Sequence, residues 1–85
     1  TWGSLYEMSP KDENENVSLK CKAMYYESKN NIVALPSEKL VVIQDLEGYI
    51  VAESDNVLLI CKLENEQKIR QFVTDVKINQ DSQYL

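Results

Sequence analysis

The 85-residue sequence contains no histidine, only two glycines and only two cysteines. Without histidine, the chain lacks the side chain best suited to proton transfer at neutral pH, the base of serine and cysteine triads and the commonest metal ligand. Any catalysis would therefore depend on carboxylates, Lys or Tyr. Because glycine is so scarce, the sequence also offers no glycine-rich phosphate loop and no Asn-Gly or Asp-Gly hairpin turn.

Basic residues are in the minority. The sequence has 9 Lys and Arg against 14 Asp and Glu, a net charge of −5 and a pI near 4.6. A protein that binds the phosphate backbone needs a basic stripe, so we expect no nucleic acid as a partner. No signal-peptide core and no apolar run of about 18 residues occurs, so we expect no membrane partner and a cytoplasmic location.

The two cysteines and the first residues bear on cellular context. Cys21 and Cys61 each lie inside an apolar run and have no CxxC partner, so we interpret them as buried free thiols rather than a disulfide or redox pair. Such thiols suit a reducing cytoplasm. The chain starts without Met and has two large aromatic side chains, Trp2 and Tyr6, among its first six residues. We therefore expect a segment of a longer protein.

The pattern along the chain predicts a short helix, then short strands. Trp2, Leu5 and Tyr6 share one helical face, and Pro10 ends that turn. A polar, turn-rich linker follows over 11–16. Strands are predicted over 17–26, 31–35, 39–44, 49–52 and 57–62, separated by turn residues.

Hydrophobic patterning within the strands limits the fold without fixing it. The first run, 17–26, alternates between apolar and polar side chains, which predicts one half-buried strand. The runs 40–43 and 57–61 are apolar on both faces, as in strands that are covered on both sides. Regularly spaced short strands suggest a sandwich, a barrel or the coils of a β-helix, and spacing alone does not choose among them.

The segment 64–78 carries the clearest helical pattern. Its apolar residues recur at i, i+3, i+4 and i+7, and Asn65 is the predicted N-cap. We expect this stripe to dock on the chain's own sheet more readily than on a partner, and the chain to fray from Asn79. The stripe consists of Ile69, Phe72, Val73 and Val76, and acid-first i, i+4 pairs are predicted for Glu64 with Lys68 and Glu66 with Arg70.

The acidic clusters in the sequence do not have the spacing of a metal site. Asp12, Glu13 and Glu15 lack the spacing and the glycine of an EF-hand loop, so we interpret them as a solvated charge run rather than a Ca²⁺ or Mg²⁺ site. Glu53 and Asp55 flank a turn residue, where turn formation explains Asp55 with fewer assumptions than a ligand role does.

The tyrosines give an equally weak functional signal. Tyr25, Tyr26 and Tyr49 could stack a ring, but a tyrosine at a strand edge with its hydroxyl in water is the commoner use. The residues alone therefore predict a non-catalytic α+β domain, with no catalytic, cofactor-binding or metal-binding residue assigned.

The order of several short segments is similar to that of a known family. Residues 1–17 are similar to a junction written D-x-G-S/T-W, then P-K-D-x-x-x-N, through Trp2, Pro10, Lys11, Asp12 and Asn16. Further similar segments are an S-x-N turn at 28–30, an R/K-L-V run ending at 42, the two runs over 46–60 and a closing helix over 67–73. In this order the segments resemble the mannose-1-phosphate guanylyltransferases over about residues 1–78.

The resemblance implies a parent enzyme that makes GDP-mannose and pyrophosphate from GTP and mannose 1-phosphate with Mg²⁺. Its chemistry would lie in an N-terminal nucleotidyltransferase domain, whose glycine-rich loop, basic residues and metal-binding Asp this sequence lacks. No catalytic residue can be carried over. The implied partners are that N-terminal domain of the same chain, contacted through Trp2 and Tyr6, and a second copy in a homodimer.

The resemblance also implies a mainly β fold, with short left-handed parallel β-helix coils and a C-terminal α-helix. The expected divisions are the end of the catalytic domain and a linker at 1–16, the β-helix at 17–62, the helix at 63–78 and a tail at 79–85. The alternatives are a free-standing acidic protein-interaction module and a small-ligand sensor domain.

Overall fold

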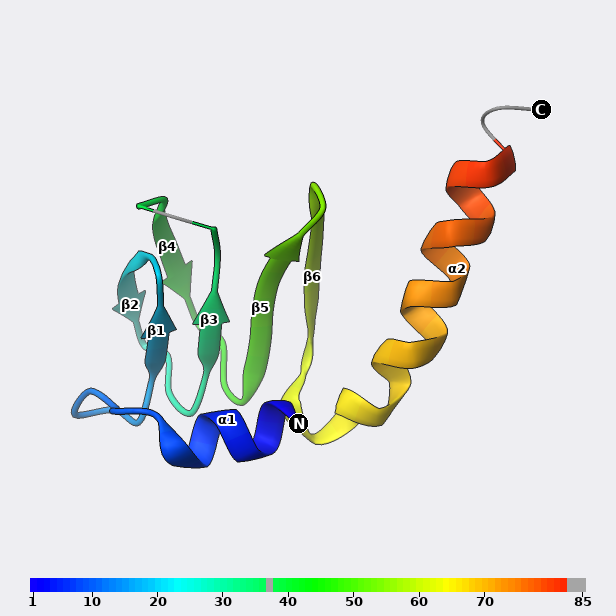
Figure 1. Ribbon diagram of the computed structural model, residues 1–85. Coiled ribbons are helices and arrows are strands. Elements are labelled where there is room, and N and C mark those ends of the chain that lie inside the picture. Colours follow the sequence, from blue (N-terminus) through cyan, green and yellow to red (C-terminus); the bar gives the residue numbers. More distant parts are fainter. Residues whose placement is uncertain (37, 83–85) are drawn as a thin grey trace.

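The computed structural model describes residues 1–36 and 38–82 (Figure 1). Strands stand side by side, with a short helix across their lower end and a longer helix at one side. In chain order the elements are α1 (Trp2–Met8), β1 (Val17–Leu19), β2 (Lys22–Tyr26), β3 (Ile32–Ala34), β4 (Leu40–Gln44), β5 (Tyr49–Ser54), β6 (Val57–Lys62), the 3₁₀ segment η1 (Leu63–Lys68) and α2 (Ile69–Ser82).

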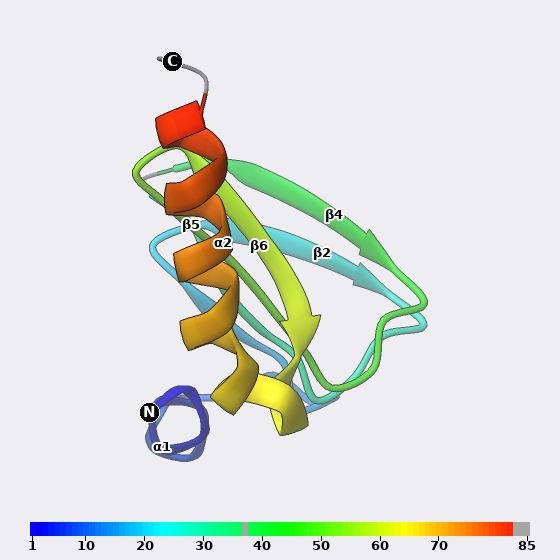
Figure 2. The same cartoon turned by 90° about the vertical axis from the view of Figure 1, so that its right-hand side faces the viewer.

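The strands form two sheets that the chain visits alternately. Sheet A is β1, β3 and β5, paired in parallel, with β6 added antiparallel to β5. Sheet B is β2 and β4, also parallel. In Figure 2, sheet B lies on one side of sheet A while α1 and α2 lie on the other. The prediction of a mainly β protein with parallel strands and a C-terminal helix is thus confirmed.

The coils turn at residues whose backbone adopts the left-handed conformation. Equivalent corners of successive coils are stacked, since the N–H of Glu38 donates to the carbonyl of Lys20 and the N–H of Asp45 to that of Tyr26. An L-residue at such a φ costs roughly 1–2 kcal/mol relative to glycine. Corner residues with φ between 53° and 74° include Lys20, Glu27, Asn30, Glu38, Asp45 and Gly48.

The single strand predicted over 17–26 is wrong, because a corner divides it into β1 and β2. Lys20, at φ 60°, turns the chain between the two strands. Leu19 packs on the face of sheet A that α1 covers, whereas Tyr25 packs between the sheets. Apolar and polar residues alternate on both sides of the corner, so a period of two could not reveal it.

Buried side chains form one cluster on each face of sheet A. Between the sheets lie Val33, Leu35, Ile43 and Val51. On the opposite face, Val17, Ile32 and Ile50 form what we call the outer cluster, each at most 1% exposed. Adjacent residues of one strand serve different clusters because successive side chains point to opposite faces.

The cysteines are free and half-buried, and they lie on different faces of sheet A. Cys21 packs on the cluster between the sheets, and Cys61 packs on the outer cluster. In the part of the chain that the structure describes, no helix is both long enough and apolar enough to cross a membrane.

The C-terminal helix begins later than its pattern predicts. Residues 63–68 form the 3₁₀ segment η1, and Asn65, the expected N-cap, lies inside it at φ −107° and ψ 22°. Among residues 1–36 and 38–82 no ion pair joins Glu64 to Lys68 or Glu66 to Arg70. The helix α2 continues to Ser82, past the point at which we expected fraying, and 83–85 lie outside the described residues.

Candidate functional site

The helix α1 carries the two side chains expected to contact another domain. Trp2 and Tyr6 are half-buried against the outer cluster of the chain's own sheet A. The Tyr6 hydroxyl donates to the carbonyl of Glu15 at 2.7 Å, and burial, followed by the charge of Glu15, raises the pKa of Tyr6. Leu5, expected beside them, is 41% exposed, and Met8 is 84% exposed. Contact of Trp2 and Tyr6 with a further domain stays a prediction.

The N-terminal end of α1 is bound by a carboxylate from the other end of the chain. Glu66, in η1, accepts hydrogen bonds from the N–H groups of Trp2 at 2.7 Å and Gly3 at 3.3 Å. Thr1 accepts from the N–H of Ser4 at 3.0 Å. These oxygens satisfy N–H groups that the helix itself leaves free, at the positive end of its dipole. Sequence reasoning missed this role of Glu66, since its partners are backbone groups that no motif reveals.

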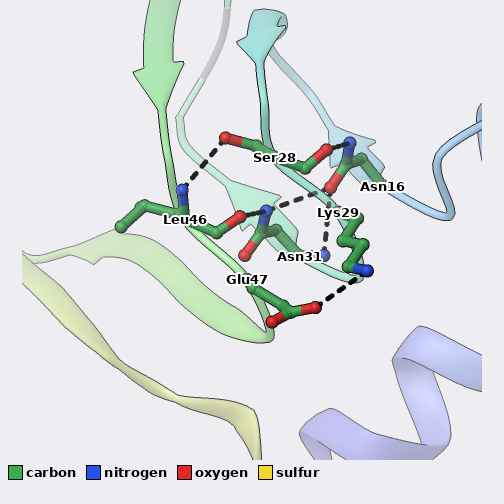
Figure 3. Close-up of polar contacts among 6 residues, drawn as sticks. All are labelled: Asn16, Ser28, Lys29, Asn31, Leu46 and Glu47. Carbon is green, nitrogen blue, oxygen red and sulfur yellow. Dashed lines mark hydrogen bonds and ion pairs between the residues drawn. The ribbon is translucent and has the colours of Figure 1, made fainter.

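Two buried asparagines connect successive coils (Figure 3). The amide of Asn16 donates to the carbonyl of Ser28 at 3.0 Å. Its oxygen accepts from the backbone N–H and the side-chain amide of Asn31, at 3.1 and 3.0 Å. Asn31 in turn donates to the carbonyl of Leu46 at 2.9 Å and accepts from the N–H of Tyr49 at 2.8 Å. We call this the asparagine ladder.

The asparagine ladder has a structural role and was not expected from the sequence. Asn16 is 2% exposed, although it belongs to the polar, turn-rich linker predicted over 11–16, and Asn31 is 0% exposed. A signal does exist, because each asparagine directly precedes a β-branched residue, Val17 or Ile32, and these two residues are partners in the sheet. In the described part of the chain no buried side-chain polar atom lacks a partner.

The acidic candidates serve local contacts. One carboxylate oxygen of Asp12 accepts from the N–H groups of Asn14 and Asn16, at 2.8 and 2.9 Å, which closes a turn. Glu53 pairs with Lys39 at 2.9 Å. Within residues 1–36 and 38–82 there is no group of three or more acidic or cysteine side chains placed to hold a metal ion.

The three tyrosines serve separate contacts. The hydroxyl of Tyr25 lies 2.7 Å from that of Ser18 and donates to the carbonyl of Val17 at 3.2 Å. Burial raises the pKa of Tyr25, and the Ser18 hydrogen bond opposes this more weakly. Tyr26, on the opposite face of the same strand, is 47% exposed. Tyr49 lies under the ammonium group of Lys62, which is 5.4 Å from the ring centroid.

The helix α2 diverges from sheet A and leaves a groove of about 410 Å³ between them. Among the side chains of α2 that the structure describes, Ile69, in the first turn, is the one that packs against the outer cluster. Farther along, Val73 is 48% exposed. Phe72 and Val76 are half-buried and line the groove together with Ala52 and Leu59, so the stripe approaches the sheet only in part. The side chains that line this groove, which we call the α2 groove, include Trp2, Ala52, Leu59, Ile69, Phe72 and Val76.

These observations define a small domain of parallel β coils followed by a helix, with a half-covered apolar face. No protein-family model matches the chain. Over 84 residues, 99% of the chain, it is 33% identical to the mannose-1-phosphate guanylyltransferase of Klebsiella pneumoniae. It is 31% identical to the Escherichia coli enzyme of the same name, also over 84 residues. The chain is thus homologous to a segment of the mannose-1-phosphate guanylyltransferases, as its sequence order indicated.

The matched segment is a small part of these relatives. The chain spans 17% of the length of each curated relative. A crystal structure from Thermus thermophilus, described as a mannose-1-phosphate geranyltransferase, is similar to 89% of this chain with a TM-score of 0.75, and the match covers 23% of that protein. At 19% sequence identity, this likeness supports the fold.

Proposed function

We propose that the chain is the C-terminal structural and assembly domain of a nucleotidyltransferase that makes GDP-mannose and pyrophosphate from GTP and mannose 1-phosphate. The observation that carries this proposal is the alignment of 99% of the chain with enzymes of that name. The chemistry belongs to an N-terminal domain of the same chain, and this segment is non-catalytic and cytoplasmic. Trp2 and Tyr6, on α1, contribute to the contact between the two domains.

The Mg²⁺ that such a reaction uses belongs to the N-terminal domain. The carboxylates here do not fit a Mg²⁺ site, because an oxygen of Asp12 already accepts two backbone hydrogen bonds and Glu53 is paired with Lys39. A cluster of free carboxylate oxygens is what the ion would need.

Left-handed coiling and a homodimer complete the proposal. Residues 18 positions apart face each other across adjacent coils, as in the contacts of Leu46 with Ser28 and Tyr49 with Asn31, which supports a hexapeptide-type β-helix. In Figure 1 the chain passes from β1 over the top to β2 behind and returns to β3 beside β1, which supports the left hand. Exposed apolar side chains on sheet B, Leu40 and Val42 at 59% and 64%, support contact with a second copy.

An activity assay tests the division of labour. The 85-residue chain, incubated with GTP, mannose 1-phosphate and Mg²⁺, should form no GDP-mannose above a heat-denatured control. A longer chain, expressed with the coding sequence upstream of Thr1, should form it. Turnover by the 85-residue chain would assign chemistry to this segment and overturn the proposal.

The second candidate is a free-standing acidic protein-interaction module. The exposed apolar residues and the net charge of −5 favour it. The upstream reading frame distinguishes the two, because a glycine-rich phosphate loop before Thr1 supports the enzyme. A start codon next to Thr1 supports the module.

A further inference from the structure

We propose that the α2 groove is the surface that receives the nucleotidyltransferase domain of the same chain, through an apolar helix of that domain. This inference rests on the proposed function and names the contact by which the two domains are held together. It assigns the main contact to sheet A and α2, while Trp2 of α1 closes one end of the groove.

The floor of the groove includes Ala52 and Leu59, which belong to a row of half-buried side chains that continues across sheet A beyond the groove. Pairing in the sheet aligns Leu19 with Ala34, Ala34 with Ala52, and Ala52 with Leu59. The row next to it, which contains Ile32 and Ile50, is covered by α1 and fully buried. The small alanines between two leucines make a hollow in the sheet, where the ridge of another element can pack.

The helix α2 forms one wall of this hollow. Figure 2 shows α1 and α2 on the same side of sheet A. The apolar stripe of α2 borders the groove through Ile69, Phe72, Val73 and Val76, although Ile69 alone among the described α2 side chains packs on the outer cluster. The sheet face and the helix face are both apolar, and the groove between them leaves part of this apolar surface exposed. A small domain normally buries such surface to stabilise its fold.

An α-helix is the element that fits this space. Outer faces of parallel strands are usually covered by helices, and α1 already covers the adjoining row in this way. Helices pack with axes about 8–10 Å apart, and the two rows of side chains lie two residues, roughly 7 Å, apart along the strands. A second helix beside α1 would therefore lie over Ala34 and Ala52 and meet α2 at its end.

The proposed function supplies the source of that helix, since it places a nucleotidyltransferase domain before this segment in the same chain. Thr1 caps α1, and the next residue, Trp2, lines the groove. A domain that precedes Thr1 is thus attached beside the groove, which gives it a high effective concentration there. The relatives are long enough to hold such a domain, since this chain aligns with 17% of their length. Charged side chains in the groove lining, Asp55 and Lys77, come from the β5–β6 turn and the later part of α2, away from Trp2.

The test compares the reactivity of a thiol in the groove between the 85-residue chain and the longer chain. Val73→Cys is made with both native cysteines changed to alanine, and its reaction with a maleimide is followed in each chain. We expect the thiol to react at least about tenfold more slowly in the longer chain, because the docked helix must open locally before the thiol can react. Thr74→Cys is the matched control, since Thr74 is the next residue of α2, is exposed and does not line the groove. It should react at similar rates in both chains.

Other occupants give other results. Equal reactivity of Val73→Cys in both chains would overturn the proposal. Protection that already appears in the 85-residue chain and rises with its concentration would assign the groove to a second copy, and would overturn it too. Formation of GDP-mannose is measured on the same longer chain. If the longer chain is active but the thiol is not protected, the proposed docking site is wrong and the proposed function stands. If the longer chain is inactive, the proposed function is wrong, and so is the identity of the docked domain.

Discussion

The carboxylate of Glu66 accepts a hydrogen bond from the backbone N–H of Trp2 at 2.7 Å, although 64 residues separate them. The contact joins the first helix to the 3₁₀ segment from which α2 departs. Because Trp2 also packs on the outer cluster and lines the α2 groove, the same contact helps to set the direction of α2. Burial raises the pKa of the nearby Cys61 thiol, and the negative charge of Glu66 raises it further.

Replacing Glu66 should loosen the junction between α1 and η1. Glu66→Ala should lower the free energy of unfolding by about 1–2 kcal/mol, because two N–H groups lose a charged acceptor. Glu66→Gln, which keeps one oxygen, should lose less. Urea denaturation monitored by the fluorescence of Trp2 measures both effects. Glu64→Ala, an exposed neighbour in the same segment, is the control and should stay within about 0.5 kcal/mol of the parent.

The asparagine ladder should be the least tolerant polar feature of the fold. Asn31→Ala would leave the Tyr49 N–H without its partner. It would also remove one of two donors from the Asn16 side-chain oxygen and from the Leu46 carbonyl, which keep the N–H groups of Asn31 and Lys29. Since a buried group left unpaired costs about 1–3 kcal/mol and each further lost hydrogen bond about 1 kcal/mol, the variant should unfold at a temperature lower by roughly 10 °C or more. Far-UV circular dichroism during a thermal scan measures this. The exposed Asn14→Ala should melt like the parent, and a normal transition for Asn31→Ala would contradict the role of the ladder.

Much of the fold follows from local patterns in the sequence. The apolar runs around Val33, Val41, Ile50 and Leu59 all became strands, because β-branched and aliphatic residues between turn residues suit covered sheets. The family resemblance also proved sound, since it used the order of segments rather than any single motif. It assigned no catalytic residue.

What the sequence did not reveal depends on contacts between distant residues or on backbone conformation. Lys20 has no propensity for a corner, yet stacking against Glu38 holds it at φ 60°. Glu66 was assigned to a pair within its own helix because helical spacing offers Arg70, whereas folding offers the free N–H groups of α1. The α2 groove was missed for a related reason, since an apolar stripe shows that a helix can dock but not where its axis will lie.

Substitutions at the corners should separate backbone strain from side-chain contacts. A Cβ added at Gly48 would meet nothing within 4 Å, so the cost of Gly48→Ala, about 1 kcal/mol, should come from its φ of 74° alone. Conversely, Lys20→Gly should stabilise the protein by up to about 1 kcal/mol. Lys22→Gly, inside β2, is the control and should destabilise it. Equal effects of the two lysine changes in urea denaturation would show that the corner carries no strain.

Alkaline pH should destabilise the protein partly through Tyr25. Burial raises the pKa of its hydroxyl in the folded state. The unfolded chain therefore releases this proton near pH 10, whereas the folded chain retains it up to its higher pKa. The stabilisation is complete below about pH 10 and is lost as the pH rises through the folded pKa. Tyr25→Phe should be less stable at pH 7 by about 1 kcal/mol, through the lost hydrogen bonds, but should lose stability less steeply above pH 10. Urea denaturation between pH 7 and 11 measures both effects. If the stability of Tyr25→Phe fell above pH 10 as steeply as that of the parent, the assignment would be contradicted.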